Sequence, residues 1–219
     1  MCIRDRYNRC TGNLSNGNTT MAQGASAWIM SFSNMGANSG KYYWETKYGG
    51  TYLKVGFITD VGSVLNTSNN GYTHHADHGK GWAAYISGGN LEIRNDASVI
   101  SGYSTSDLST SFSSGDILCL ALDMDNGRFH FRKNDGSWLK SGDPVNNSGG
   151  LTIPFSDTIG RIAIPAISAY TAEGNTNFGN GYFGTTAVSS AGTNASGNGI
   201  FEYNVPTGFT ALSTKGLNL

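Results

Sequence analysis

Charge is scarce in this chain, and so are the strong helix formers. Only 13% of its 219 residues are Asp, Glu, Lys or Arg, and the formal net charge is −1. Proteins that neutralise phosphates carry a basic surplus, so we expect no nucleic-acid partner. No apolar run approaches the roughly 20 residues that cross a bilayer, so we expect no membrane partner. Three cysteines are too few for a disulfide framework, and Cys119 is expected to be a small buried hydrophobe.

Glycine and aromatic residues are abundant instead. The chain has 31 glycines, 11 tyrosines and 10 phenylalanines. Aromatic residues favour strands, and glycine favours turns. Apolar residues nowhere recur at helical spacing over eleven or more residues, so we expect no α-helix. The composition is typical of an all-β domain with many short strands and long polar loops.

Several stretches have the pattern of strands. They are residues 41–45, 52–59, 81–86, 91–94, 161–168, 200–203 and 209–212. The first two, separated by Gly49-Gly50, are expected to form an antiparallel pair, with Leu53, Val55 and Phe57 on one face. Residues 81–86 and 91–94 are expected to form a hairpin around 87–90. Pro165 has no N–H, so its strand is expected to be an edge strand or to carry a bulge.

The segment 115–136 carries the clearest local signal. Asn126-Gly127 favours a two-residue hairpin loop, because a type I′ turn needs positive φ at both central residues. That loop would pair Met124 with Phe129 and Leu122 with Phe131. Four apolar side chains then share one face, which predicts a scaffold hairpin. The neighbouring acidic residues read as turn formers and cross-strand partners of basic residues, since the remaining ligands of a calcium loop are missing.

Residues 1–13 are treated apart from the domain. The peptide Met-Cys-Ile-Arg-Asp-Arg at 1–6 resembles the translation of an adaptor used to prepare sequencing libraries. We therefore expect residues 1–13 to be a non-native or disordered fragment and residues 14–219 to form a single domain. The strand spacing predicts a two-sheet antiparallel β-sandwich.

The order of these motifs resembles the SPRY family. The resemblance rests on Gly40-Lys41-Tyr42-Tyr43-Trp44-Glu45, Val55-Gly56-Phe57, the segment 115–136, Pro165-Ala166-Ile167-Ser168 and Asn177-Phe178-Gly179. It covers about residues 14–213 and implies a concanavalin-like, jelly-roll type of sandwich. Residues 134–144, the motif at 177–179 and residues 206–212 are similar to SPRY modules of bacteriophage virion and tail-associated proteins. The richness in Gly, Ser, Thr and Asn fits that setting.

Candidate binding residues lie in two loops. Tyr72, His74, His75 and His78 fall in the polar loop 60–80. The histidine types could bind a metal, but their spacing matches no known ligand set, so we expect a recognition loop without a metal. Trp138 and Lys140 fall in the loop 134–158. Two interpretations of Trp138 stay open: it is either an exposed recognition anchor or a lid that packs on the end of the sandwich.

Catalysis and cofactors find no support in the residues. The Gly-rich sequence at 179–184 lacks the helix that a dinucleotide site needs. There is no nucleophile elbow and no cysteine with an evident histidine partner. We therefore expect a protein that is not an enzyme and has no cofactor.

The functional expectation is a recognition or structural module. It would belong to a phage virion protein of the tail or fibre, bind a host surface glycan or protein through loops, and act on the virion or outside the cell. Three alternatives stay open: an assembly module that contacts other virion proteins, an intracellular (cytoplasmic) SPRY protein that binds a peptide, and a polysaccharide hydrolase.

Overall fold

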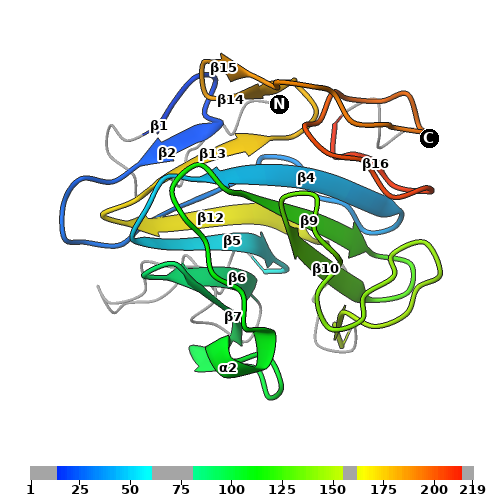
Figure 1. The fold of residues 1–219 in the computed structure, drawn as a ribbon, viewed down its shortest axis with the longest axis horizontal. Coiled ribbons are helices and arrows are strands. Elements are labelled where there is room, and N and C mark those ends of the chain that lie inside the picture. The colour runs from blue at the N-terminus through cyan, green and yellow to red at the C-terminus, as the bar shows by residue number, and fades with distance from the viewer. Residues whose placement is uncertain (1–13, 61–80, 155–161, 214–219) are drawn as a thin grey trace.

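The computed structural model describes residues 14–60, 81–154 and 162–213. Their strands form two large antiparallel sheets and one small hairpin (Figure 1). One sheet has the order β1 (Leu14–Ser15), β2 (Thr20–Ala22), β13 (Glu173–Asn177), β4 (Lys41–Tyr48), β9 (Ile117–Asp123), β10 (Arg128–Lys133), β11 (Leu151–Thr152), with β16 (Thr210–Ala211) parallel to β4. The other has the order β3 (Ile29–Phe32), β12 (Ile164–Tyr170), β5 (Tyr52–Ile58), β6 (Gly81–Ser87), β7 (Asn90–Asn95), β8 (Ser98–Val99). The small hairpin pairs β14 (Tyr182–Phe183) with β15 (Thr186–Ala187). The predicted all-β sandwich is confirmed.

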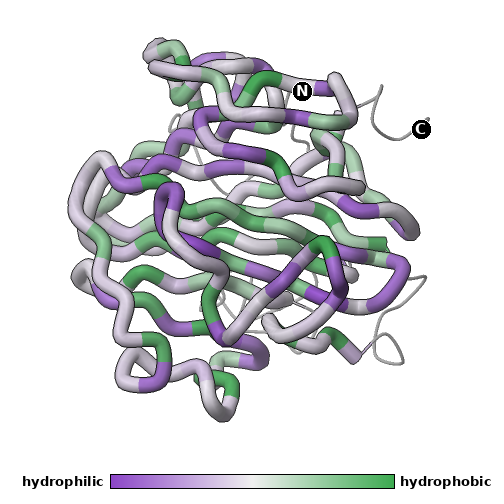
Figure 2. Tube along the Cα trace, turned by 45° about the vertical axis from the view of Figure 1, so that its right-hand side comes forward, coloured by the Kyte–Doolittle hydropathy of each residue, from purple (hydrophilic) through white to green (hydrophobic). Residues whose placement is uncertain are grey.

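The main core lies between the two large sheets. Phe57 stacks on Trp82 at 5.3 Å and meets the edge of Phe129 at 5.2 Å. Phe129 in turn meets Phe131 at 4.8 Å. Alternate strand residues point to opposite faces, and Figure 2 shows hydrophobic stretches along the central strands. The predicted inner face of β5 is confirmed, since Leu53, Val55 and Phe57 are all buried in this core.

The C-terminal segment, residues 178–213 after β13, covers part of the outer face of the eight-stranded sheet. A second apolar cluster joins Tyr43 and Cys119 of the sheet to Phe201 and Phe209 of this segment. Glu45 fixes the segment by accepting the Glu202 N–H and the Tyr203 N–H, each at 2.9 Å. In Figure 1 β14 and β15 lie at the top of the view, above β13, and β16 lies to the right, beside β4. The expected strand at 200–203 is wrong, because Ile200 forms only an isolated bridge to Asn180.

The hairpin of β9 and β10 has a different register from the predicted one. Leu122 pairs with Phe129 and Asp123 with Arg128, so the loop has four residues, 124–127, instead of two. Asp123 stabilises the longer loop by accepting the N–H groups of Asp125 and Asn126 at 3.0 Å each. Within residues 124–127 only Gly127 has positive φ. The shift is two residues, which leaves the apolar face unchanged.

The expected pair of β4 and β5 is also wrong. The two strands lie in different sheets, because the chain crosses the sandwich between them. At the crossing Gly50 has φ 127° and Thr51 has φ 50°, which turns the chain out of the plane of β4. Gly49 N–H donates to Glu173 O on the first sheet, and Gly88 N–H donates to Thr51 O on the second.

Pro165 lies in a central strand and not at the predicted edge or bulge. β12 pairs with β3 on one side and β5 on the other. The Pro165 C=O accepts from Ser33 N–H at 2.8 Å, one residue past the end of β3. The bond that would need a Pro165 N–H therefore falls where the β3 ladder has already ended, so the proline is tolerated there.

Two further local expectations have contrasting outcomes. The hairpin of β6 and β7 is confirmed: Ser87 pairs with Asn90, and Gly88 and Gly89 have φ of 54° and 89°, as a type I′ turn requires. The loop after β8 contains a four-residue helix, α2 (Thr105–Leu108), capped by Ser104. Among the described residues, no helix is long and apolar enough to span a membrane.

Candidate functional site

The structure bears on only two of the six predicted binding residues. Tyr72, His74, His75 and His78 lie outside the described residues. Trp138 is half-buried and packs against the second apolar cluster. The Arg132 guanidinium lies 4.8 Å above its ring. This position corresponds to the interpretation of Trp138 as a lid that packs on the sandwich. Lys140 is exposed, with its ammonium 5.7 Å from the ring of Tyr103.

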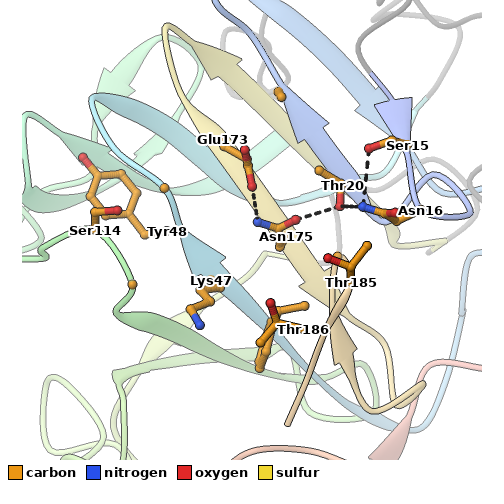
Figure 3. Close-up of a pocket in the computed structure, with 15 residues that line it drawn as sticks. Ser15, Asn16, Thr20, Lys47, Tyr48, Ser114, Glu173, Asn175, Thr185 and Thr186 are labelled. Atoms are coloured by element: carbon orange, nitrogen blue, oxygen red, sulfur yellow. Dashed lines mark hydrogen bonds between the residues drawn. The ribbon is translucent and has the colours of Figure 1, made fainter. Parts of the chain in front are cut away.

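A groove lined by several polar side chains lies on the outer face of the eight-stranded sheet. It encloses about 440 Å³ (Figure 3). Its floor is a cross-strand row in which Thr20 of β2 is the register partner of Asn175 of β13, and Asn175 is the partner of Lys47 of β4. Because these residues share one face, antiparallel pairing alone brings three polar side chains side by side. We call this hollow the polar groove.

A chain of hydrogen bonds crosses the floor of the polar groove. Thr20 Oγ1 donates to Asn175 Oδ1 at 2.7 Å, and Asn175 Nδ2 donates to Glu173 Oε1 at 2.6 Å. Asn16 Nδ2 donates to Thr20 Oγ1 at 3.0 Å. Figure 3 shows this chain running from Ser15 and Asn16 to Glu173, with Lys47, Thr185 and Thr186 opposite it. Each side chain is thereby held in one orientation before a ligand arrives.

Gly184, in the turn between β14 and β15, sets the width of the groove. Its φ is 63°, and a Cβ placed there would lie 2.7 Å from Asn175 Oδ1 and 3.1 Å from Thr20 Oγ1. Any larger residue would displace the hydrogen-bonded chain. The hairpin therefore approaches the floor as closely as it does because this position is glycine.

The side chains that line the groove are suited to hydrogen bonding with a polar ligand. The groove offers hydroxyl, amide, ammonium and carboxylate groups, with Lys47 and Glu173 as its charged residues. Burial raises the pKa of the Cys119 thiol, on β9, to about 12, which keeps it protonated near neutral pH. No group of three His, Cys, Asp or Glu side chains within residues 14–60, 81–154 and 162–213 is arranged to hold a metal ion.

The groove residues were not among the predicted sites. Thr20, Lys47, Glu173 and Asn175 each look like an ordinary polar residue on the exposed face of a strand. Alternation alone indicates which face they occupy. It cannot indicate that three strands far apart in the sequence become neighbours, since strand order is decided by the tertiary fold.

Comparison with known proteins gives the fold. No protein-family model matches the chain, and no curated protein is similar in sequence. Among solved structures, the TRIM65 PSpry domain is 11% identical with a TM-score of 0.51, covering 78% of this chain and 83% of that one. The chain has a SPRY-like fold. The stonustoxin structure is 18% identical with a TM-score of 0.50, covering 74% of this chain and 24% of that one. The SPRY domain of human HERC1 is 15% identical with a TM-score of 0.48, covering 72% and 86%.

Proposed function

We propose that this SPRY-like domain is a non-catalytic recognition module whose ligand binds in the polar groove. The observation that carries the proposal is the ordered chain of side chains Asn16, Thr20, Asn175 and Glu173 under the β14–β15 hairpin. Small-molecule and peptide sites commonly combine a concave surface with a few polar groups in fixed positions. This groove has both features.

The ligand would be polar and close to neutral. Amide and hydroxyl groups match the main chain of an extended protein segment and equally the hydroxyls of a glycan. One ammonium, Lys47, and one carboxylate, Glu173, balance each other within the groove. A polyanion would need several cations together. We therefore infer a host surface protein or glycan as the partner.

The setting we propose is a tail or fibre protein of a phage virion, acting on the virion or outside the cell. Its support is the similarity of residues 134–144, 177–179 and 206–212 to phage SPRY modules, with the Gly-, Ser-, Thr- and Asn-rich composition. Predicted contacts of Tyr72, His74, His75, His78, Trp138 and Lys140 with the ligand belong to this proposal. They would extend the binding surface beyond the groove.

The test is binding of the labelled full chain to a panel of bacterial cells and to arrays of bacterial polysaccharides. Asn175→Ala and Lys47→Ala each remove a polar group from the floor, and Gly184→Ala pushes a methyl group into it. We expect each to weaken binding roughly tenfold or more. Ser101→Ala, at an exposed position outside the groove, is the matched control and should bind as the wild type does.

Each other outcome selects a different function. Normal binding by all three groove variants would place the ligand elsewhere and reject the groove. A chain that binds no cells or polysaccharides but coassembles with virion proteins would be an assembly module. Release of sugar from capsule would identify a hydrolase, and binding confined to intracellular peptides would indicate a cytoplasmic partner.

A further inference from the structure

A second hollow lies on the outer face of the other sheet. Its lining residues are Trp28, Tyr52, Tyr85 and Tyr170, and it encloses about 340 Å³. All four rings are half-buried, so each presents part of its surface to solvent. Trp28 immediately precedes β3 and lies over the outer face of the sheet, outside the core. We call this hollow the aromatic bowl.

Strand register gathers the rings. Tyr170 of β12 is the partner of Tyr52 of β5, and Tyr85 of β6 is the partner of Lys54, two residues further along β5. The ring centroids of Trp28 lie 5.9 Å from Tyr85 and 5.7 Å from Tyr170. These pairs are tilted at 57° and 47°, so the rings line a concave surface instead of stacking on each other.

A cation already lies against two of the rings that form the bowl. Lys54 is only 1% exposed, and its Nζ lies 4.8 Å from the Trp28 ring and 5.0 Å from the Tyr85 ring. Aromatic cages that recognise quaternary ammonium groups leave that position open for the ligand. Here the buried Lys54 ammonium already lies against the Trp28 and Tyr85 rings, so a second cation bound to them would meet its positive charge. A cationic ligand is therefore a poor fit.

An extended peptide that adds a strand is also a poor fit. β5 lies between β12 and β6, and β12 lies between β3 and β5, so their backbone groups already pair on both sides. Strand addition needs an open sheet edge. What the bowl offers is ring faces and tyrosine hydroxyls. The Glu92–Arg94 ion pair, 2.6 Å long, borders it, with the Arg94 guanidinium 5.1 Å from the Tyr85 ring.

We propose that the aromatic bowl is a saccharide-binding site that takes one pyranose ring. A pyranose has an apolar face of C–H groups that carry partial positive charge, and this face complements the negative faces of aromatic rings. Its equatorial hydroxyls point sideways, toward the tyrosine hydroxyls and the Glu92–Arg94 pair. The site lies on a different sheet from the polar groove and stands independently of the function proposed for that groove.

The test uses the full chain and methyl pyranosides of glucose, galactose and N-acetylglucosamine as probes. Two-dimensional ¹H–¹⁵N NMR resolves the indole N–H signals of the four tryptophans. Trp28→Phe identifies the Trp28 signal by its disappearance. We expect at least one pyranoside to shift this signal in a saturable titration, while the signals of the buried Trp44 and Trp82 stay in place.

Variants separate binding in the bowl from non-specific contact. Tyr52→Ala and Tyr170→Ala should each weaken pyranoside binding roughly tenfold or more, since each removes a ring from the wall. Tyr182→Ala, which removes a tyrosine that is 48% exposed on β14, should leave binding unchanged.

Three results would overturn the proposal. The first is no Trp28 shift with any pyranoside. The second is a Trp28 shift with tetramethylammonium or adenosine monophosphate but not with sugars, which would assign the bowl to cations or bases. The third is equal weakening by Tyr182→Ala. Because Asn175→Ala alters only the polar groove, its effect on cell binding tests the first site separately.

Discussion

His130 makes a sharp prediction about stability and pH. It is 1% exposed on β10, and neither ring nitrogen has a hydrogen-bond partner among the described residues. Its Nδ1 lies against Gly150, where an added Cβ would come within 2.4 Å, and its ring centroid lies 6.2 Å from that of Trp138. Burial, together with the positive charge of Arg128, lowers its pKa from 6.5 to about 4.

The direction of the effect follows from which state binds the proton. Between pH 6.5 and about 4 the unfolded chain protonates His130 and the folded chain does not. The free energy of unfolding must therefore fall as the pH is lowered through this window. A difference of this size in pKa corresponds to about 3 kcal/mol. Above pH 6.5 the contribution of His130 is constant.

Other groups act in the same pH range or below it, so the comparison must be between variants. Burial raises the pKa of Glu45 from 4.5, which makes stability fall as pH rises, the opposite direction. The pKa values of Asp116 and Asp123 are lowered from 3.8 by hydrogen bonds and neighbouring lysines, which outweigh their burial. Their contributions are lost only at more acid pH. Comparing wild type with a His130 variant isolates the contribution of His130 to the pH dependence of the free energy of unfolding.

The assay is urea unfolding at several pH values from 7.5 to 4, followed by tryptophan fluorescence, for wild type and His130→Phe. The larger ring adds a packing cost of about 1–3 kcal/mol that is the same at every pH. Relative to wild type, the variant should gain about 3 kcal/mol between pH 7 and pH 4. His130→Leu repeats the test with a smaller side chain. If both variants and wild type lose stability in parallel, the reasoning is refuted.

Two further variants test how closely the backbones of β5 and β6 approach each other and how the C-terminal segment is anchored. Gly56→Ala would place a Cβ 1.9 Å from Trp82 O, so it should lower the free energy of unfolding, measured in urea, by at least about 2 kcal/mol. The control Gly24→Ala, where an added Cβ meets nothing within 4 Å, should change this free energy little. Equal effects of the two variants would show that β5 and β6 can separate freely. Glu45→Gln removes one of the two carboxylate oxygens that accept the Glu202 and Tyr203 N–H groups. It should lower the free energy of unfolding by about 1–3 kcal/mol and speed hydrogen exchange of those two amides. Unchanged exchange would contradict the anchoring role of Glu45.

The binding surfaces show where sequence reasoning stops. Alternation in residues 52–58 separates Leu53, Val55 and Phe57 from Tyr52 and Lys54, and this separation is confirmed. What it cannot indicate is that Tyr170, more than a hundred residues later, becomes the register partner of Tyr52. Both the aromatic bowl and the polar groove depend on such pairings between distant strands. A single sequence carries no local signal for them.

The sequence by itself determined the long strands β4, β5, β6, β7, β9, β10 and β12, the buried face of β5 and the tight turn at Gly88-Gly89, because alternation and turn chemistry act over a few residues. The tertiary structure decided registers and strand neighbours. The loop at 124–127 is the clearest case, since two registers that differ by two residues bury the same faces. Contacts at the start of β4 select between them: Gly40, just before the strand, donates its N–H to Asp125 Oδ1 at 2.7 Å, and Lys41 pairs with Asp123 at 3.1 Å. These partners lie more than eighty residues away, so only the folded chain brings them to the turn.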